Sequence, residues 1–264
     1  MSFVIRSKDY KRQGFRPVAV IEGGDQNGKR VFLNDTLESK QDCLKLDKGK
    51  FMTLPDANMV KNDIRTEKVY VAGSSGSGKS FYISKWLKLF LKKKRKDMPV
   101  YIFSTIDYDR SLDDIFPDNI IRLEIDIGLI TSPIHPSELS DSIVIFDDSD
   151  NIPDARVRKT VQNLRSQILE CGRHYGITML NTSHQLLNYM MTRTLLLEST
   201  QVVFFPRSSA GTKHIKAYLT NYGGLDKEQI SKILKLNSRW VAHMRCYNPY
   251  IISEKEIYML KDED

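Results

Sequence analysis

Gly73-Ser74-Ser75-Gly76-Ser77-Gly78-Lys79-Ser80 is the stretch that decides the fold, because it fits the phosphate-binding loop pattern G-x-x-x-x-G-K-[ST] at every fixed position. Glycines let successive backbone N–H groups curl around an anion, and a following helix points the positive end of its dipole at the phosphates. The pattern predicts that Lys79 reaches the β- and γ-phosphates and that the Ser80 hydroxyl coordinates Mg²⁺. We therefore expect a site for a nucleoside triphosphate.

The sequence on both sides of this loop has the required order of strand, loop and helix. Residues 68–72, Lys-Val-Tyr-Val-Ala, read as a short buried strand. Apolar residues then recur at helical spacing, at Ile83, Trp86, Leu87, Phe90 and Leu91. The residues expected to contact ATP are Gly73, Ser74, Ser75, Gly76, Ser77, Gly78, Lys79, Ser80 and Phe81.

A second motif follows at residues 141–148, Asp-Ser-Ile-Val-Ile-Phe-Asp-Asp, an apolar strand that ends in two carboxylates. An acidic strand end is the usual partner of a phosphate-binding loop. We expect Asp147 to hold Mg²⁺, directly or through water, and Asp148 to polarise the water that attacks the γ-phosphate. Two acids at a strand end are common, so the prediction depends on the pairing of the two motifs.

The pattern of the chain predicts an α/β fold with a mostly parallel central sheet and helices on both faces. Strand-like runs alternate with helical periodicity at residues 99–103, 120–123, 142–146, 177–181 and 201–205. The strands between the two motifs are typical of ATPases that insert a strand there. Residues 1–50 predict a small β-rich N-terminal extension, with a hairpin of 16–21 and 30–33 around Asn27-Gly28, and residues 51–264 predict the ATPase domain.

Three further stretches predict local structure. Val157, Val161, Leu164 and Ile168 form an apolar helical stripe, which predicts a helix whose basic residues, Arg165 among them, face outward. Residues 226–236 predict a helix that begins at Asp226, and residues 240–244 predict a strand. Ser253-Glu254-Lys255-Glu256 has the form of a capping box, which indicates a helix start.

Length and composition fit a single soluble-type globular domain with a small appended segment. The chain has 264 residues, of which 41% are hydrophobic and 28% charged, and no run approaches the ~20 apolar residues of a membrane span. The N-terminus has no apolar segment typical of a signal peptide, so we expect a protein that is not secreted. Cys43, Cys171 and Cys246 are odd in number and scattered, which favours free thiols.

The net charge of +7 and the pI near 9.1 favour encounters with polyanions such as nucleic acid, although solubility alone is an equally good explanation. The densest run of charge, residues 92–96, invites a DNA-contact interpretation. It also lies at the expected C-terminal end of the helix after the phosphate loop, where cations are favoured by the helix dipole. Cys171, His174 and His184 lack the remaining ligands of a zinc pattern, so we do not predict zinc there.

Further downstream, Glu170-Cys171-Gly172-Arg173-His174-Tyr175-Gly176-Ile177 precedes a strand that ends in Asn181-Thr182-Ser183-His184-Gln185. The order of GSSGSGKS, SIVIFDD, ECGRHYGI and NTSHQ resembles the genome-packaging ATPases of large double-stranded DNA viruses, the poxvirus-type branch of the FtsK–HerA superfamily. The resemblance covers residues 68–185 by motif, with weaker similarity at residues 239–241 and at Pro249.

This resemblance implies a RecA-like core that assembles into a ring of five or six subunits and pumps duplex DNA through its centre. It also implies that Arg173 is an arginine finger for the neighbouring subunit's γ-phosphate, with Arg165 as a second candidate, and that Gln185 is the polar sensor. The superfamily usually has Glu after the metal-binding Asp, whereas this chain has Asp148, whose shorter side chain would have to act as the base through a shifted backbone or a second water.

The sequence therefore predicts an ATPase that uses ATP and Mg²⁺ to move double-stranded DNA into a viral capsid. The expected partners are DNA, other copies of the chain in a ring and a capsid or inner-membrane protein of the virion, and the expected location is the virion or the viral factory in the host cytoplasm. Three alternatives remain: a cellular FtsK/HerA-like or plasmid-mobilising ATPase, a nucleotide-dependent scaffold with slow hydrolysis, and a nucleotide kinase. The sequence shows no basic lid segment that would favour a kinase.

Overall fold

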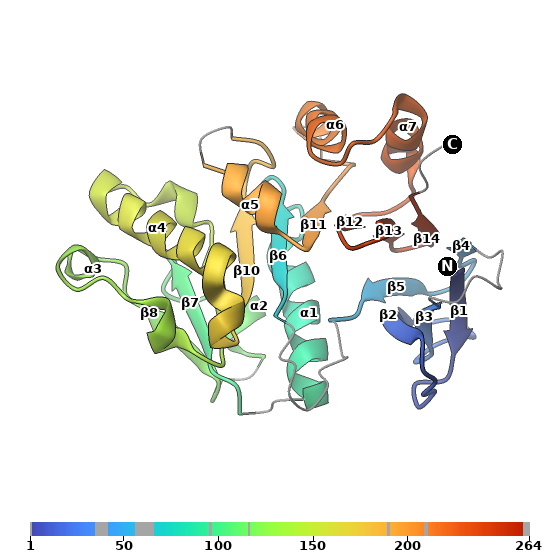
Figure 1. The fold of residues 1–264 in the computed structure, drawn as a ribbon, viewed down its shortest axis with the longest axis horizontal. Coiled ribbons are helices and arrows are strands. Elements are labelled where there is room, and N and C mark those ends of the chain that lie inside the picture. The colour runs from blue at the N-terminus through green and yellow to red at the C-terminus, as the bar shows by residue number, and fades with distance from the viewer. Residues whose placement is uncertain are drawn as a thin grey trace.

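A computed structural model describes residues 2–34, 42–55, 66–94, 97–115, 117–188, 191–208 and 211–260, without the side chains of residues 92–94. Its centre is a 10-stranded sheet in the order β4-β14-β13-β12-β11-β6-β10-β9-β7-β8. The strands from β11 to β8 pair in parallel, and those from β12 to β4 continue the sheet antiparallel. The chain therefore has the α/β fold and the mostly parallel sheet that the sequence predicts (Figure 1).

The parallel part consists of β6 (Lys68–Ala72), β7 (Val100–Ser104), β8 (Ile120–Leu123), β9 (Ile143–Asp147), β10 (Thr178–Ser183) and β11 (Gln201–Phe204). Successive side chains of a strand point to opposite faces, so the side chains of one strand pack into two hydrophobic clusters. In β9, Ile143 and Ile145 join one hydrophobic cluster while Val144 and Phe146 join the other. Because both faces are covered, these strands are continuous apolar runs rather than alternating ones.

Helices cover both faces of the parallel strands. The long helices are α1 (Lys79–Lys94), α4 (Ala155–Cys171), α6 (Thr212–Asn221) and α7 (Lys227–Lys235), and the short ones are α2 (Arg110–Asp113), α3 (Gly128–Thr131) and α5 (Arg193–Glu198). Three 3₁₀ turns complete the set: η1 (Pro136–Leu139), η2 (Ser149–Asn151) and η3 (Gly172–Tyr175). Trp86 of α1 packs in the first cluster and Leu164 of α4 in the second, so the two helices lie on opposite faces.

The apolar stripe predicted for α4 is buried, but the prediction that Arg165 faces outward is wrong. Arg165 is only 3% exposed. Its guanidinium lies 2.9 Å from Asp150 and also donates to the carbonyl of Met191 and the amide oxygen of Asn181. These partners replace the water that a buried cation would lose.

The antiparallel part consists of β12 (Val241–Met244), β13 (Tyr250–Ser253), β14 (Glu256–Met259) and β4 (Cys43–Lys45). Here the predicted capping box is wrong, because Ser253 to Glu256 form the turn between β13 and β14 rather than a helix start. The Ser253 hydroxyl still accepts the N–H groups of Lys255 and Glu256, at 3.4 and 2.9 Å. The same side-chain hydrogen bonds serve a tight turn as well as a helix start, and the β-forming residues that follow decide between them.

The first part of the chain forms a separate 4-stranded antiparallel sheet of β1 (Ser2–Arg6), β3 (Arg30–Asn34), β2 (Phe15–Glu22) and β5 (Lys50–Thr53). The predicted hairpin around Asn27-Gly28 corresponds to β2 and β3. This sheet packs against the rest of the molecule, with the rings of Phe3 and Tyr250 at 5.6 Å and an ion pair between Glu22 and Lys85 at 2.6 Å. The predicted boundary after residue 50 falls one residue into β5, which joins the small sheet, whereas β4, which precedes it, joins the large sheet.

The sequence also raises the questions of a basic DNA-contact run and of a membrane span. The side chains of the basic run 92–96 lie outside the described residues. Among the helices that the structure does describe, none has the length and apolar character needed to cross a bilayer.

Candidate functional site

The phosphate-binding loop lies between the carboxyl end of β6 and the start of α1, as the sequence predicts. Two of its glycines are required by geometry. A Cβ at Gly73 would come within 2.6 Å of both Phe205 and the Ser77 hydroxyl, and Gly78 has a φ of +109°, which side chains rarely allow. The loop therefore keeps a backbone that can approach an anion closely, at the N-terminus of a helix of 16 residues.

Lys79 is the first residue of α1 and is buried, with 7% of its surface exposed. Its ammonium donates to the carbonyl of Gly73 at 3.0 Å, which folds the side chain back over the loop. It also lies 3.8 Å from Asp148 Oδ2 and 3.4 Å from His184 Nδ1. The structure thus brings the predicted phosphate-binding lysine and the predicted base to the same place.

Asp147 ends β9 and is 4% exposed. Its Oδ1 accepts the Thr182 hydroxyl at 2.7 Å, and its Oδ2 lies 3.5 Å from the Ser104 hydroxyl. Burial raises the pKa of this carboxyl, and the neighbouring charges of Asp148 and Asp109 raise it further. A cation held at this carboxylate would oppose both effects.

The donor set fits Mg²⁺, which prefers hard oxygen ligands and commonly takes one or two from the protein and the rest from phosphates and water. Asp147 offers a buried carboxylate, and Ser80 offers a half-buried hydroxyl on the first turn of α1. Both residues lie at the carboxyl edge of the parallel strands, because α1 follows β6, Asp147 ends β9, and only β10 lies between these two strands in the sheet.

Asp148 has a left-handed backbone, with φ 46° and ψ 32°, which is uncommon for a residue with a side chain. Its N–H donates to the Thr182 hydroxyl oxygen at 2.8 Å, and its Oδ2 lies 3.1 Å from His184 Nε2. Such strained residues often occur at functional sites, where surrounding contacts hold them in place. With this backbone, the Asp148 carboxylate lies 3.8 Å from the Lys79 ammonium, whereas the Asp147 carboxylate contacts Thr182 and Ser104.

Phe81 lies in the first turn of α1, and 57% of its surface is exposed. The Lys85 ammonium lies 5.5 Å from the centre of its ring. An exposed aromatic ring one turn from the phosphate loop is a surface on which a nucleotide base can stack. Its predicted contact with ATP stays a prediction.

The two candidate fingers occupy different environments. Arg173 lies in η3 and is exposed, at the amino end of β10, whereas the phosphate loop lies at the carboxyl edge. β10 has 6 residues, so the two edges are about 20 Å apart at ~3.3 Å per residue. Arg173 therefore does not reach the phosphate loop of its own chain, and its role as a finger stays a prediction. Arg165 is engaged within its own chain and has no exposed guanidinium to offer.

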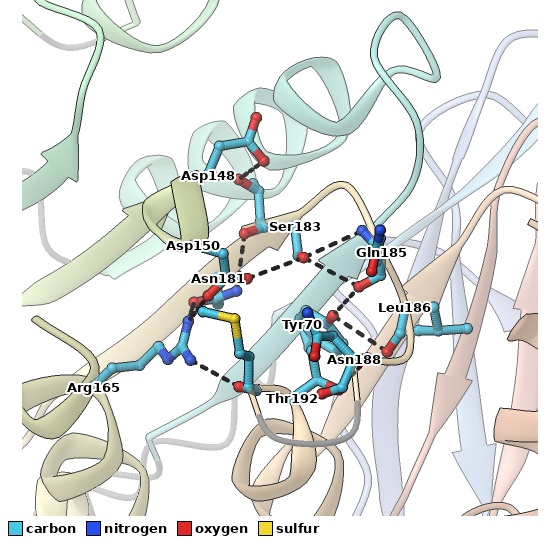
Figure 2. A network of polar contacts seen from close by, with 12 residues as sticks. Tyr70, Asp148, Asp150, Arg165, Asn181, Ser183, Gln185, Leu186, Asn188 and Thr192 are labelled. Atoms are coloured by element: carbon cyan, nitrogen blue, oxygen red, sulfur yellow. Dashed lines mark hydrogen bonds and ion pairs between the residues drawn. The ribbon is translucent and has the colours of Figure 1, made fainter. Parts of the chain in front are cut away.

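Gln185, the predicted sensor, is exposed and follows β10 at the carboxyl edge. Its N–H contacts the Ser183 hydroxyl at 3.3 Å, and its carbonyl accepts the Tyr70 hydroxyl at 2.7 Å. Figure 2 shows how Ser183 connects this residue to Asp150, and through Asp150 to Arg165. The backbone of Gln185 is thus firmly held, while its role as a sensor stays a prediction.

Sequence reasoning missed several residues that the structure places at the site. Thr182 bridges Asp147 and Asp148, and His184 contacts both Asp148 and Lys79. The Arg239 guanidinium lies against the loop, 3.7 Å from where a Cβ of Gly78 would be. Thr182 and His184 belong to the same NTSHQ run as Gln185. Because β10 lies between β6 and β9, the end of β10 is the position nearest to both motifs.

The parallel sheet, the glycine loop that opens α1 and the acidic end of β9 together define the fold of a P-loop NTPase. The cytoplasmic domain of the type VII secretion ATPase EccC from Thermomonospora curvata has a similar fold. The TM-score is 0.50 at 10% identity, over 98% of this chain and 30% of that one. The genome packaging NTPase B204 of Sulfolobus turreted icosahedral virus 2 is another match, with a TM-score of 0.43 and 16% identity over 75% of this chain and 97% of that one.

A sequence relative places the chain more closely. It is 34% identical over 269 residues to the uncharacterized protein V3 of Sputnik virophage, covering 96% of this chain and 97% of the relative. The chain belongs to the same family as this virophage protein. No protein-family model matches the sequence.

Proposed function

We propose that the protein is an ATP-driven motor that moves double-stranded DNA into a viral capsid. The observation that carries the proposal is the convergence of Lys79, Asp147 and Asp148 at the carboxyl edge of three adjacent strands, next to a phosphate-binding loop. In α/β proteins this edge is where ligands bind. A buried cation and two carboxylates of different environment supply the parts that phosphoryl transfer needs.

Each residue has a separate task in the proposed hydrolysis. The loop amides and Lys79 would hold the β- and γ-phosphates, and Ser80 and Asp147 would hold Mg²⁺, which would supply positive charge to offset that of the phosphate oxygens. Asp148 accepts a proton from the attacking water. At the same time the water oxygen bonds to the γ-phosphorus and the bond from that phosphorus to ADP breaks. Asp148 suits this task because it is less buried than Asp147, with 22% of its side chain exposed.

The assignment to DNA packaging has three supports. The order of the four motifs resembles viral packaging ATPases of the FtsK–HerA superfamily, the related protein V3 comes from a virophage, and the net charge of +7 favours polyanions. Arg173 lies about 20 Å from its own loop by the length of β10, so as a finger it would act on a nucleotide of a neighbouring subunit. We therefore include in the proposal a homo-oligomeric ring and a capsid or inner-membrane protein as docking partner.

The test of the nucleotide site is Lys79→Ala, with Lys216→Ala, an exposed lysine on helix α6, as the matched control. Nucleotide affinity is measured by calorimetry and ATP turnover by phosphate release, with Mg²⁺ present. We expect Lys79→Ala to lower turnover by at least about 100-fold, since its ammonium faces the developing charge, and Lys216→Ala to match wild type. Wild-type turnover in Lys79→Ala would refute the proposed mechanism, and nucleotide binding without turnover in wild type would favour the scaffold alternative.

A further inference from the structure

His184 occupies a place in the site that the proposed hydrolysis does not yet use. It directly follows β10, whose last residue Ser183 pairs with Ala72 of β6 on one side, while β9 lies on the other. The imidazole consequently reaches both motifs, with Nδ1 at 3.4 Å from Lys79 Nζ and Nε2 at 3.1 Å from Asp148 Oδ2. It is 41% exposed, so it is held by these contacts rather than by a packed core.

The two partners determine which ring nitrogen carries the proton. A lysine ammonium is only a donor, so Nδ1 must accept, and a neutral imidazole then carries its hydrogen on Nε2. A carboxylate is only an acceptor, which matches an Nε2–H that donates to Asp148. The order of donor and acceptor from Lys79 through His184 to Asp148 is therefore consistent at every step.

Counting protons at Thr182 shows why Asp148 depends on this donor. The Thr182 hydroxyl has one proton, and its contact to Asp147 Oδ1 at 2.7 Å is much shorter than its contact to Asp148 Oδ1 at 3.3 Å. Its oxygen already accepts the N–H of Asp148. Thr182 thus fixes the backbone of Asp148 and the side chain of Asp147. Among the residues that the structure describes, His184 is then the closest donor to the Asp148 carboxylate.

We propose that His184 is a positioning residue that holds the Asp148 carboxylate in the orientation needed to accept the proton of the attacking water. The proposal rests on the proposed ATP hydrolysis. The effect belongs to the rate of the chemical step rather than to nucleotide binding.

The experiment compares His184→Ala, His184→Asn and His184→Gln, with His214→Gln on α6 as the matched control. Gln places its amide nitrogen close to the position of imidazole Nε2, whereas Asn places it close to Nδ1. We expect His184→Ala and His184→Asn to lower kcat about 10- to 100-fold with KM changed less than about 3-fold, and His184→Gln to recover most of kcat. His214→Gln should behave as wild type.

A second arm uses Asp148→Asn as background. If His184 acts through Asp148, adding His184→Ala to Asp148→Asn lowers kcat no further, because the two changes remove one function. The proposal would be overturned if His184→Ala lowered kcat by the same factor in both backgrounds, or if it raised KM as Lys79→Ala does. Either result would assign His184 to the phosphates. A wild-type protein without turnover above Lys79→Ala would remove the proposed function itself, whereas active wild type with an unaffected His184→Ala removes only this inference.

Discussion

Asp147 is a single residue at which the proposed function lowers the stability of the fold. Its pKa is raised mainly by burial, so the ionised form that would hold Mg²⁺ is disfavoured in the folded chain. A raised carboxyl pKa lowers stability as pH rises through the folded pKa, because the folded state must then ionise a buried group. We expect Asp147→Asn to increase the free energy of unfolding at pH 7 without nucleotide, while abolishing turnover.

Urea unfolding at pH 7 and at pH 4 measures the difference in the free energy of unfolding between wild type and Asp147→Asn. The Asn side chain can still accept the Thr182 hydroxyl, so the change removes charge without removing the hydrogen bond. The difference between the proteins should shrink as pH falls toward the usual pKa of an aspartate, because protonation then removes the buried charge from the folded wild type. A destabilised Asp147→Asn at pH 7 would contradict the assignment of burial as the dominant influence.

His243 gives a second pH effect, far from the nucleotide site. It is 2% exposed, its Nδ1 lies 2.9 Å from the Tyr218 hydroxyl, and burial together with the charge of Arg245 lowers its pKa to about 4. The unfolded chain binds a proton near pH 6.5 and the folded chain does not, so stability is lost as pH falls from about 6.5 to 4. The loss is about 3 kcal/mol at most.

Replacing His243 by Gln should remove this part of the acid sensitivity. Thermal unfolding of wild type and His243→Gln between pH 7 and 4.5 provides the comparison, each protein measured against its own value at pH 7. We expect a smaller drop for the variant. Equal drops in both proteins would mean that other groups cause the acid sensitivity.

At the level of elements, α4 is anchored to the site by one buried ion pair. Arg165 and Asp150 lie 2.9 Å apart with 4% and 15% of their side chains exposed, and Arg165 also binds the carbonyl of Met191 before α5. Removing one partner of a buried pair leaves an uncompensated charge, at a cost of about 3–5 kcal/mol. We expect that loss for Arg165→Ala in chemical unfolding.

The control on the same helix is Arg156→Ala. Arg156 pairs with Asp154 at 3.4 Å, but 71% of its side chain is exposed, so the change should cost less than about 1 kcal/mol. A combined Arg165→Met and Asp150→Asn variant should recover much of the loss, because it removes both charges. Equal losses of unfolding free energy in Arg165→Ala and Arg156→Ala would show that burial does not determine how much an ion pair contributes to stability.

Local sequence predicted the elements best where one signal decided them. β6 and β8 match their predicted ranges, because apolar runs of 5 and 4 residues are too short for a buried helix and fit a strand. The prediction of a helix start at Ser253 is wrong because helix starts and hairpin turns share the same side-chain hydrogen bonds. The burial of Arg165 and the contacts of His184 were not predictable locally, since their partners Asp150 and Asp148 come from other parts of the chain.

At the level of the whole molecule, the separation of Arg173 from its own loop predicts that activity depends on assembly. We expect Arg173→Ala to leave ATP affinity nearly unchanged and to lower turnover by about 10³-fold or more, as loss of an arginine finger does. Mixing Arg173→Ala with Asp148→Asn subunits should restore part of the activity, because some interfaces combine an intact Arg173 with an intact Asp148. Mixtures no more active than either variant alone would remove the support for a finger in trans.

The central claim is that ATP hydrolysis in this protein is coupled to duplex DNA within an assembly of subunits. The most direct measurement is ATP turnover with and without long double-stranded DNA, over protein concentrations that span assembly, with Lys79→Ala as the baseline. The account predicts turnover that DNA stimulates and that rises more than proportionally with protein concentration. Turnover that exceeds the Lys79→Ala baseline but responds to neither DNA nor concentration would contradict it and leave only a nucleotide-hydrolysing site.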